Sequence, residues 1–414
     1  MGILAPLRVA LCLALCHARL VTFSNTLPRR DSAGAVLNAH DGTTQRFPSA
    51  PGKFYYHAMG YPACNETGEV NGCNNCIFSR KNSMNVFSSP DLSSGSWTLE
   101  QPLYPGAAGF PECTYFRTQA VYNAATQLYV LWANSAGCAP HVCPNNTCAA
   151  YVTATSPSPA GPFTFQGMVE PTAAQLGNRS GFIGDFALFV DKDGAGYIIL
   201  THGTHGAGSR DMYIFSLTAD YLGIGTATTG ILPGQKLVEA PAFFRRGSVY
   251  YALLGGCTCM GLYGGGVGVL TAPHPLGPWS NITGSLDPGC PMWAQADCFA
   301  MGPGKVCNPV TQAQQNCEFW GREKGCVLYI FPVTLSPCSL TTSPPAPPLC
   351  TADVITVPLA DGTLAYIWTG DKWQQSPDHM FDLQPQTWLP LSFDADGAIQ
   401  PLQYVDSFQL DIAA

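Results

Sequence analysis

The chain has 414 residues, of which only 11% are charged, and its net charge is −8 at pH 7. The 19 basic residues are spread thinly and form no basic stripe, which argues against nucleic acid as a partner. The 43 glycines and 35 prolines indicate many turns and few charged amphipathic helices, so the composition favours a large all-β protein.

The N-terminus is typical of a signal peptide. Arg8 precedes a short apolar run from Val9 to Cys16, and the small residue Ala18 follows. This run is too short to cross a bilayer, and no later stretch reaches about 18 apolar residues. We therefore expect residues 1–20 to be a signal peptide, residues 21–414 to be the folded domain, and the protein to be secreted, with no membrane partner.

The cysteines agree with export. Two of the 18, Cys12 and Cys16, lie in the expected signal peptide, which leaves an even number, 16. In an exported chain this predicts disulfides rather than zinc ligands. Four glycosylation sequons support the same location, at Asn65, Asn145, Asn178 and Asn281. No metal-ligand spacing is present, so we expect neither a catalytic metal nor another cofactor.

Five short segments repeat along the chain, and each is a turn followed by a strand rich in Tyr, Val, Ile and Trp. Their central residues are Tyr55, Tyr129, Tyr197, Tyr250 and Tyr366. A second repeat combines a Pro-containing turn with an aromatic residue, at Trp97, Phe163 and Trp279. Such repeats predict radial repetition of small antiparallel sheets, as in a β-propeller. A segment rich in Cys, Pro and Ser, from about residue 287 to 350, interrupts the last interval and is predicted to form disulfide-stapled loops.

Five motifs occur in an order that resembles glycoside hydrolase family 43, and most closely its exo-β-1,3-galactanase subset. They are NAHDG from Asn38, FRTQAVYN from Phe116, GDFALFVDKDG from Gly184, LVEAPAFF from Leu237 and YIWTGDKW from Tyr366. The resemblance implies a five-bladed β-propeller. It also implies a secreted, monomeric glycosidase that hydrolyses O-glycosidic bonds of a plant- or cell-wall-type polysaccharide, exo-acting and inverting on β-1,3-galactan, with a polysaccharide or oligosaccharide as its substrate.

An inverting glycosidase needs a carboxylic acid that protonates the leaving oxygen and a base that activates water. Glu239, which stands in an apolar stretch before a proline, matches the family's acid, and Asp185 matches the residue that tunes the acid's pKa. The alternative for Glu239 is an ion pair with Arg245 or Arg246. Asp191 belongs to an Asp-Lys-Asp-Gly hairpin turn and is predicted to be structural.

The base has more than one candidate. Asp41, in His40-Asp41-Gly42, is either the base or the start of a turn, because Asp-Gly is a turn dipeptide. In the galactanase subset a fifth-blade Gln serves instead, and it aligns with Gln314 or Gln315. The segment from Thr351 competes for that strand, and it contains no Gln.

Further residues are candidates for substrate binding. The family's second-blade Glu is replaced by Phe116, with Glu112 as the nearest carboxylate, whereas the family's Arg is retained as Arg117, which binds substrate or pairs with Asp185. The other candidates are His40, Asp371 of the fifth-blade motif, and the aromatic platforms Tyr263, Trp293, Trp368 and Trp373. The loss of the second-blade Glu motivates an alternative function, a catalytically impaired carbohydrate-binding propeller.

Overall fold

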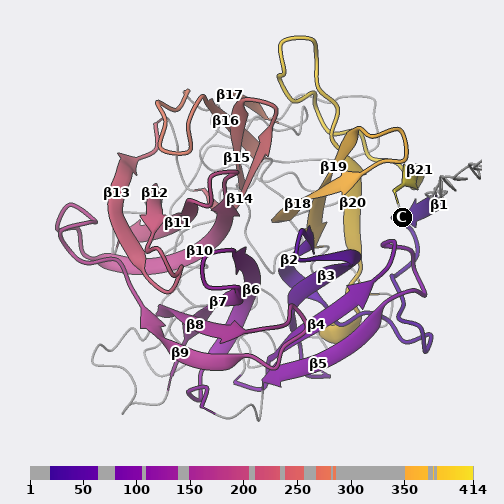
Figure 1. The fold of residues 1–414 in the computed structure, drawn as a ribbon, viewed down its shortest axis with the longest axis horizontal. Coiled ribbons are helices and arrows are strands. Elements are labelled where there is room, and N and C mark those ends of the chain that lie inside the picture. Colours follow the sequence, from indigo (N-terminus) through magenta and orange to yellow (C-terminus); the bar gives the residue numbers. More distant parts are fainter. Residues whose placement is uncertain are drawn as a thin grey trace, which may run out of the picture.

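The computed structural model describes residues 19–63, 80–104, 109–138, 149–204, 210–233, 238–255, 267–280, 283–285, 350–371, 376 and 380–413. All but two of its strands form five small antiparallel sheets arranged around a common centre (Figure 1). The only helix among these residues is the short 3-10 helix η2 (Phe381–Leu383). The predicted all-β, five-bladed propeller is confirmed.

Each blade runs outward from the centre in sequence order. The first blade is β2 (His40–Phe47), β3 (Ala50–Gly60), β4 (Ser83–Ser89) and β5 (Thr98–Tyr104). The second is β6 (Thr114–Asn123), β7 (Leu128–Ala136), β8 (Ala150–Ser156) and β9 (Thr164–Val169). The third is β10 (Gly181–Val190), β11 (Gly196–Thr204), β12 (Arg210–Leu217) and β13 (Ile224–Ile231). The fourth is β14 (Glu239–Arg246), β15 (Val249–Gly255), β16 (Val267–Ala272) and β17 (Thr283–Ser285). The fifth has three strands, β18 (Cys350–Pro358), β19 (Leu364–Asp371) and β20 (Gln386–Pro390).

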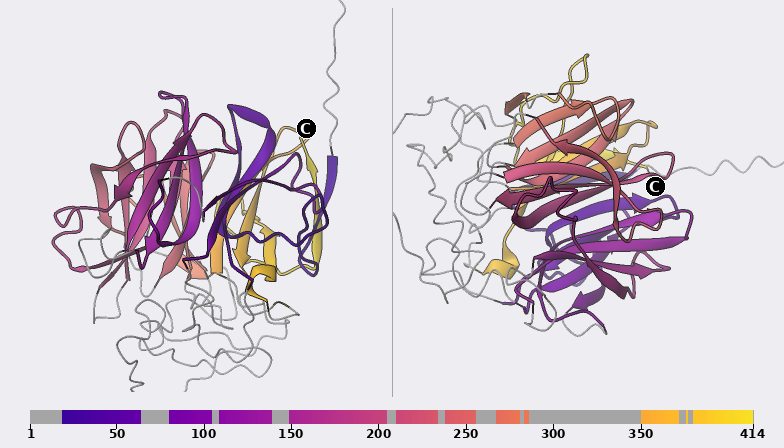
Figure 2. Two further views of the ribbon diagram at one scale, coloured as in Figure 1. Left: turned by 90° about the horizontal axis from the view of Figure 1, so that it is seen from below. Right: turned by 90° about the vertical axis from the view of Figure 1, so that its left-hand side faces the viewer.

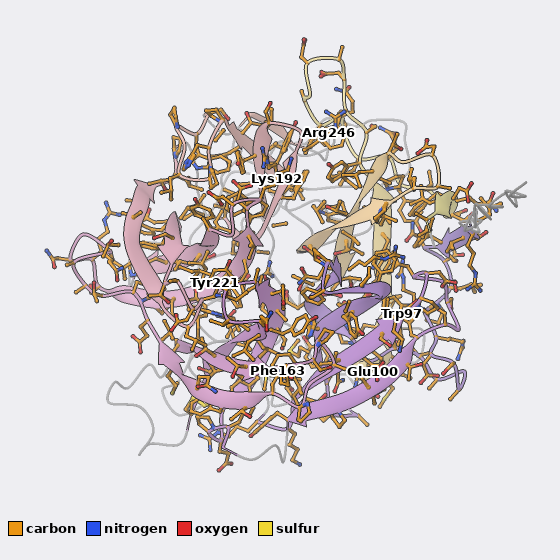
Figure 3. The ribbon with its side chains drawn as sticks, in the orientation of Figure 1. Trp97, Glu100, Phe163, Lys192, Tyr221 and Arg246 are labelled. Carbon is orange, nitrogen blue, oxygen red and sulfur yellow. A yellow bond between two sulfur atoms is a disulfide. The ribbon has the colours of Figure 1, made fainter. Side chains whose placement is uncertain are left out.

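The predicted repeats correspond to fixed places in the blades. Every repeated tyrosine lies on the second strand of its blade, from Tyr55 on β3 to Tyr366 on β19. Trp97 and Phe163 directly precede the outer strands β5 and β9, and both lie away from the centre of the ring (Figure 3). The predicted insertion falls between β17 and β18 and lies outside the described residues.

A hydrophobic core fills each of the five blade interfaces. Between the second and third blades, for example, Trp132 packs against Phe186, and its indole N–H donates to the Tyr221 carbonyl at 2.8 Å. The aromatic strands predicted from the sequence therefore supply contacts between blades. Because each sheet buries its faces only against its neighbours, no blade has a complete core of its own.

The ring is closed by both ends of the described chain. β1 (Arg19–Ser24) pairs antiparallel with β21 (Ser407–Ile412), and the two strands lie side by side at one edge (Figure 2). The expected signal peptide, residues 1–20, shares Arg19 and Leu20 with β1, and its other residues lie outside the described part of the chain. One disulfide lies within the described residues, between Cys113 and Cys138. No helix in the described part of the chain is long and apolar enough to cross a membrane.

Candidate active site

The inner strands share an irregularity at the same level of the ring. In β2, β6, β10 and β14, two residues stand opposite one residue of the second strand, at 41–42, 117–118, 184–185 and 240–241. β18 has a register shift between Thr351 and Asp353. A β-bulge of this kind re-aims a side chain and frees backbone groups from the ladder. Residues far apart in the sequence are thereby presented to the centre of the propeller.

Three of the bulges contain a non-glycine residue in the left-handed region. Asp41, Arg117 and Ala240 have φ angles of 48°, 52° and 50°. This conformation is uncommon for residues with a side chain, and such residues cluster at functional sites. Two of the three were singled out from the sequence as candidate site residues.

Arg117 connects four blades. Its Nη1 donates to Asp41 Oδ1 at 2.6 Å and lies 3.9 Å from Asp185 Oδ2. Its Nε donates to the Phe186 carbonyl and its Nη2 to the Pro241 carbonyl, both at 2.8 Å. The side chain is only 1% exposed. The predicted proximity to Asp185 is present, but the closer carboxylate is that of Asp41.

The third and fourth blades bring Asp185 beside the strand that begins with Glu239. Asp185 Oδ2 accepts the backbone N–H of Ala240 at 3.1 Å, and Glu239 itself is partly buried. Arg245 bonds to Asp191 at 2.8 Å and Arg246 stacks on Phe393, both from the opposite end of β14. These contacts leave neither arginine as a partner of Glu239.

Asp41 is held in place by the fifth blade. Its backbone N–H donates to Asp371 Oδ2 at 2.8 Å, and Asp371 Oδ1 lies 3.8 Å from His40 Nδ1. His40 and Asp371 are buried, so neither is an exposed substrate contact in this structure, and Asp371 holds the backbone of Asp41.

The two carboxylates beside Arg117 each keep an oxygen for another partner. Asp41 and Asp185 are 16% and 14% exposed, and within the described residues Asp41 Oδ2 and Asp185 Oδ1 have no hydrogen bond. Burial raises the pKa of the Asp41 carboxyl well above its usual range; Arg117 opposes this shift, whereas Asp185 and Asp371 add to it. A carboxyl with a raised pKa is a stronger base once it has lost its proton.

Asp353 was not identified from the sequence. It lies on β18, where its Oδ2 accepts the Thr44 N–H of β2 at 3.0 Å, and burial raises its pKa to about 7. The segment from Thr351 therefore forms the inner strand of the fifth blade, as one alternative predicted. The TADV sequence around Asp353 matches no motif, so only the position of the strand reveals this carboxyl.

The other substrate-binding candidates are placed differently. Glu112 lies just before β6 with 67% of its side chain exposed, and Arg80 Nη1 is 3.6 Å from it, so it does not join the central cluster. Trp368 is only 1% exposed and packs in the core between the fourth and fifth blades, which corrects its prediction as an aromatic platform. Phe116 is buried at 6% exposure. Tyr263, Trp293, Trp373, Gln314 and Gln315 lie outside the described residues.

The arrangement is suited to proton transfer at the centre of the ring. Carboxyl groups from the first and third blades flank a guanidinium, and the third-blade carboxylate bonds to the backbone beside a fourth-blade Glu. Within the described ranges, no group of three or more His, Cys, Asp or Glu side chains is arranged to hold a metal ion. Paired carboxyl groups of this kind can act as general acids and bases.

Comparisons with known proteins agree with this fold. The model of the family described as glycosyl hydrolases family 43 matches residues 77–286, which is 210 of the 414 residues. No significant match to the sequence was found among curated proteins.

Solved structures share the fold at low identity. An exo-β-1,3-galactanase from Clostridium thermocellum is 19% identical, with a TM-score of 0.61 over 94% of this chain and 67% of that chain. A variant of exo-β-1,3-galactanase from Phanerochaete chrysosporium, solved with β-1,3-galactotriose, is 17% identical, with a TM-score of 0.60 over 94% and 68%. A family 43 β-1,3-galactosidase solved with galactodeoxynojirimycin is 20% identical, with a TM-score of 0.56 over 93% and 99%.

Proposed function

Since the chain belongs to glycosyl hydrolase family 43 and is therefore a glycosidase, we propose that it is a secreted, exo-acting, inverting hydrolase of β-1,3-galactan. The observation that carries the proposal is the cluster of Asp41, Arg117 and Asp185 beside the start of β14, where Glu239 lies. The galactan preference is supported by the structural similarity to exo-β-1,3-galactanases. Secretion is supported by the signal-peptide pattern.

In this mechanism Glu239 is the general acid and Asp41 the general base. Glu239 donates its proton to the glycosidic oxygen as the bond from that oxygen to the anomeric carbon breaks. A water molecule attacks the anomeric carbon from the opposite face and gives a proton to Asp41 Oδ2, so the configuration inverts. Arg117 stabilises the ionised form of Asp41 before the reaction, because it lies 2.6 Å from Oδ1.

Asp185 accepts the N–H of Ala240 and so fixes the backbone next to the acid. It also places a negative charge near the start of β14, and a neighbouring negative charge favours the protonated form of a carboxyl group. Asp185 therefore supports both the position and the protonation of Glu239.

The proposal is tested by the release of galactose from β-1,3-galactan. We expect Glu239→Gln and Asp41→Asn each to lower kcat by about 100-fold or more, because each removes a proton-transfer group. Glu112→Gln is the matched control and should retain activity, since Glu112 is exposed and pairs with Arg80 outside the cluster. Gln314→Ala and Gln315→Ala should also retain activity if Asp41 is the base. NMR of the first product should show the α-anomer.

Specific outcomes would contradict each part. Equal release by wild type and Glu239→Gln would exclude Glu239 as the acid. Loss of activity in a Gln314 or Gln315 variant, with activity kept in Asp41→Asn, would transfer the role of base to that glutamine.

The buried Phe116, where the family has Glu, favours one alternative function. If the wild type binds galactan but releases no sugar from galactans, arabinans or xylans, the protein is a carbohydrate-binding propeller without activity.

A further inference from the structure

The two residues that follow Glu239 are held by side chains of other blades. In β14 the bulge places residues 240 and 241 opposite a single residue of β15, and Pro241 has no N–H to contribute to a ladder. The N–H of Ala240 donates to Asp185 of the third blade at 3.1 Å. The carbonyl of Pro241 accepts from Arg117 Nη2 of the second blade at 2.8 Å. The bulge is thus fixed at one backbone group on each side of the Ala240–Pro241 peptide.

Arg117 is itself rigidly located. Its Nε donates to the Phe186 carbonyl at 2.8 Å, its Nη1 donates to Asp41 at 2.6 Å, and the side chain is 1% exposed. The guanidinium is planar, so three bonds in different directions determine its position and orientation. The position of the Pro241 carbonyl is therefore tied to the first and third blades through one side chain.

We propose that Arg117 is a positioning residue for the general acid, acting through the Pro241 carbonyl on the bulge that begins at Glu239. This inference rests on the proposed function. The acid must meet the glycosidic oxygen within hydrogen-bond reach, and a misplacement of about 1 Å can lower a rate by about 100-fold. Arg117 differs in this respect from a residue that only stabilises the fold.

Gln119 offers a matched control on the same strand. Its Nε2 donates to the same acceptor, the Phe186 carbonyl, at 2.8 Å, and its Oε1 accepts the Leu188 N–H at 2.9 Å. Like Arg117 it is 1% exposed. It joins the second and third blades, and among the described residues it has no hydrogen bond to the fourth blade, so its loss weakens a blade interface without releasing the bulge of β14.

The test compares two substrates that differ in their need for the acid. The disaccharide β-1,3-galactobiose has a poor leaving group that must be protonated, whereas the fluoride of β-galactosyl fluoride leaves with little assistance. We expect Arg117→Lys to lower kcat/KM for galactobiose by at least about 10-fold more than for the fluoride, because a lysine ammonium cannot hold the Pro241 and Phe186 carbonyls together, whereas the lost contact to the base Asp41 slows both substrates equally. Gln119→Ala should lower both values by the same factor.

Arg117→Gln serves as a second variant, and thermal unfolding of each variant identifies the folded ones for the comparison. If folded Arg117 variants lose the same factor on both substrates, or lose nothing on galactobiose, the positioning role is wrong while the proposed function stands. If the wild type hydrolyses neither substrate, the proposed function is wrong, and the role of Arg117 is overturned with it.

Discussion

At the scale of single residues, the centre of the propeller places the buried cation Arg117 among several acids. The Arg117 guanidinium faces Asp41 and Asp185, whereas Asp371 and Asp353 lie close by on the fifth blade. A buried acid without a close cation retains its proton to a higher pH. For Asp353 burial is the largest influence on the pKa, and the backbone N–H groups of Thr44 and Val354 and the more distant charge of Arg117 oppose it only in part.

Asp353 provides a pH-dependent test of this view. Its pKa is raised to about 7 by burial, so the folded protein holds a proton that the unfolded chain releases near pH 4. Stability should therefore fall as the pH rises from about 4 to about 7. Asp353→Asn keeps an acceptor for the Thr44 N–H, and we expect it to remove the part of the pH dependence of stability that comes from Asp353. At pH 8 the variant should be more stable than wild type, by at most about 4 kcal/mol.

The measurement is urea unfolding of both proteins between pH 4 and pH 8. The difference in the free energy of unfolding between the two proteins reports on Asp353 alone, because the other acids, such as Asp41, whose pKa is also raised by burial, are present in both. A difference that stays constant across this range would show that Asp353 is ionised throughout.

The site was predictable where a motif carries the residue, and less so elsewhere. Asp41 and Arg117 lie in the motifs NAHDG and FRTQAVYN, and the structure brings them into contact. Asp353 has no motif around it. Trp368 lies in the motif YIWTGDKW, but the motif does not show that its side chain is buried. Whether an aromatic side chain faces the core or the centre depends on the packing of neighbouring blades, which a local pattern does not contain.

At the scale of elements, the bulge of β2 explains why Gly42 follows Asp41. A Cβ atom at Gly42 would lie 2.0 Å from the His57 carbonyl oxygen of β3, so the bulge requires a residue without a side chain. The Asp-Gly dipeptide indicated a turn from the sequence. The structure instead places it inside a strand, because the bulge depends on the pairing with β3 and on the Asp371 side chain.

Gly42→Ala should therefore damage both stability and activity. The clash is with backbone, which cannot rotate away, and we expect a loss of about 2–3 kcal/mol in the free energy of unfolding, together with lower release of galactose. Gly52→Ala is the matched control, because a Cβ there would meet no atom within 4 Å. Urea unfolding of the two variants decides the matter: equal midpoints would show that the bulge tolerates a side chain.

At the scale of the whole molecule, the ring depends on its closure. Within the described residues the fifth blade has three strands, and the segment after β1 lies against its outer strand β20. Asn25 makes two hydrogen bonds with the backbone of Trp388, both at 2.8 Å. Asn25 Nδ2 donates to the Trp388 carbonyl, and the Trp388 N–H donates to Asn25 Oδ1. The Asn25 side chain thus imitates the backbone of a fourth strand. Arg29 continues the contact, with its guanidinium 3.9 Å above the Trp388 ring.

Opening this closure should weaken all blades together. Each blade interface holds one of the five cores, and the core between the fifth and first blades also contains Val21 and Phe23 of β1. Asn25→Ala removes two buried hydrogen bonds to Trp388 and a part-buried one to the Val405 carbonyl, and we expect it to lower the free energy of unfolding by about 2–4 kcal/mol. Thr26→Ala, at an exposed neighbour, should change it by less than about 0.5 kcal/mol.

Unfolding in urea, followed by tryptophan fluorescence and circular dichroism, should show one transition at a lower midpoint for Asn25→Ala. Two separate transitions would mean that the fifth blade can detach while the others stay folded, which would contradict a ring held together by shared cores.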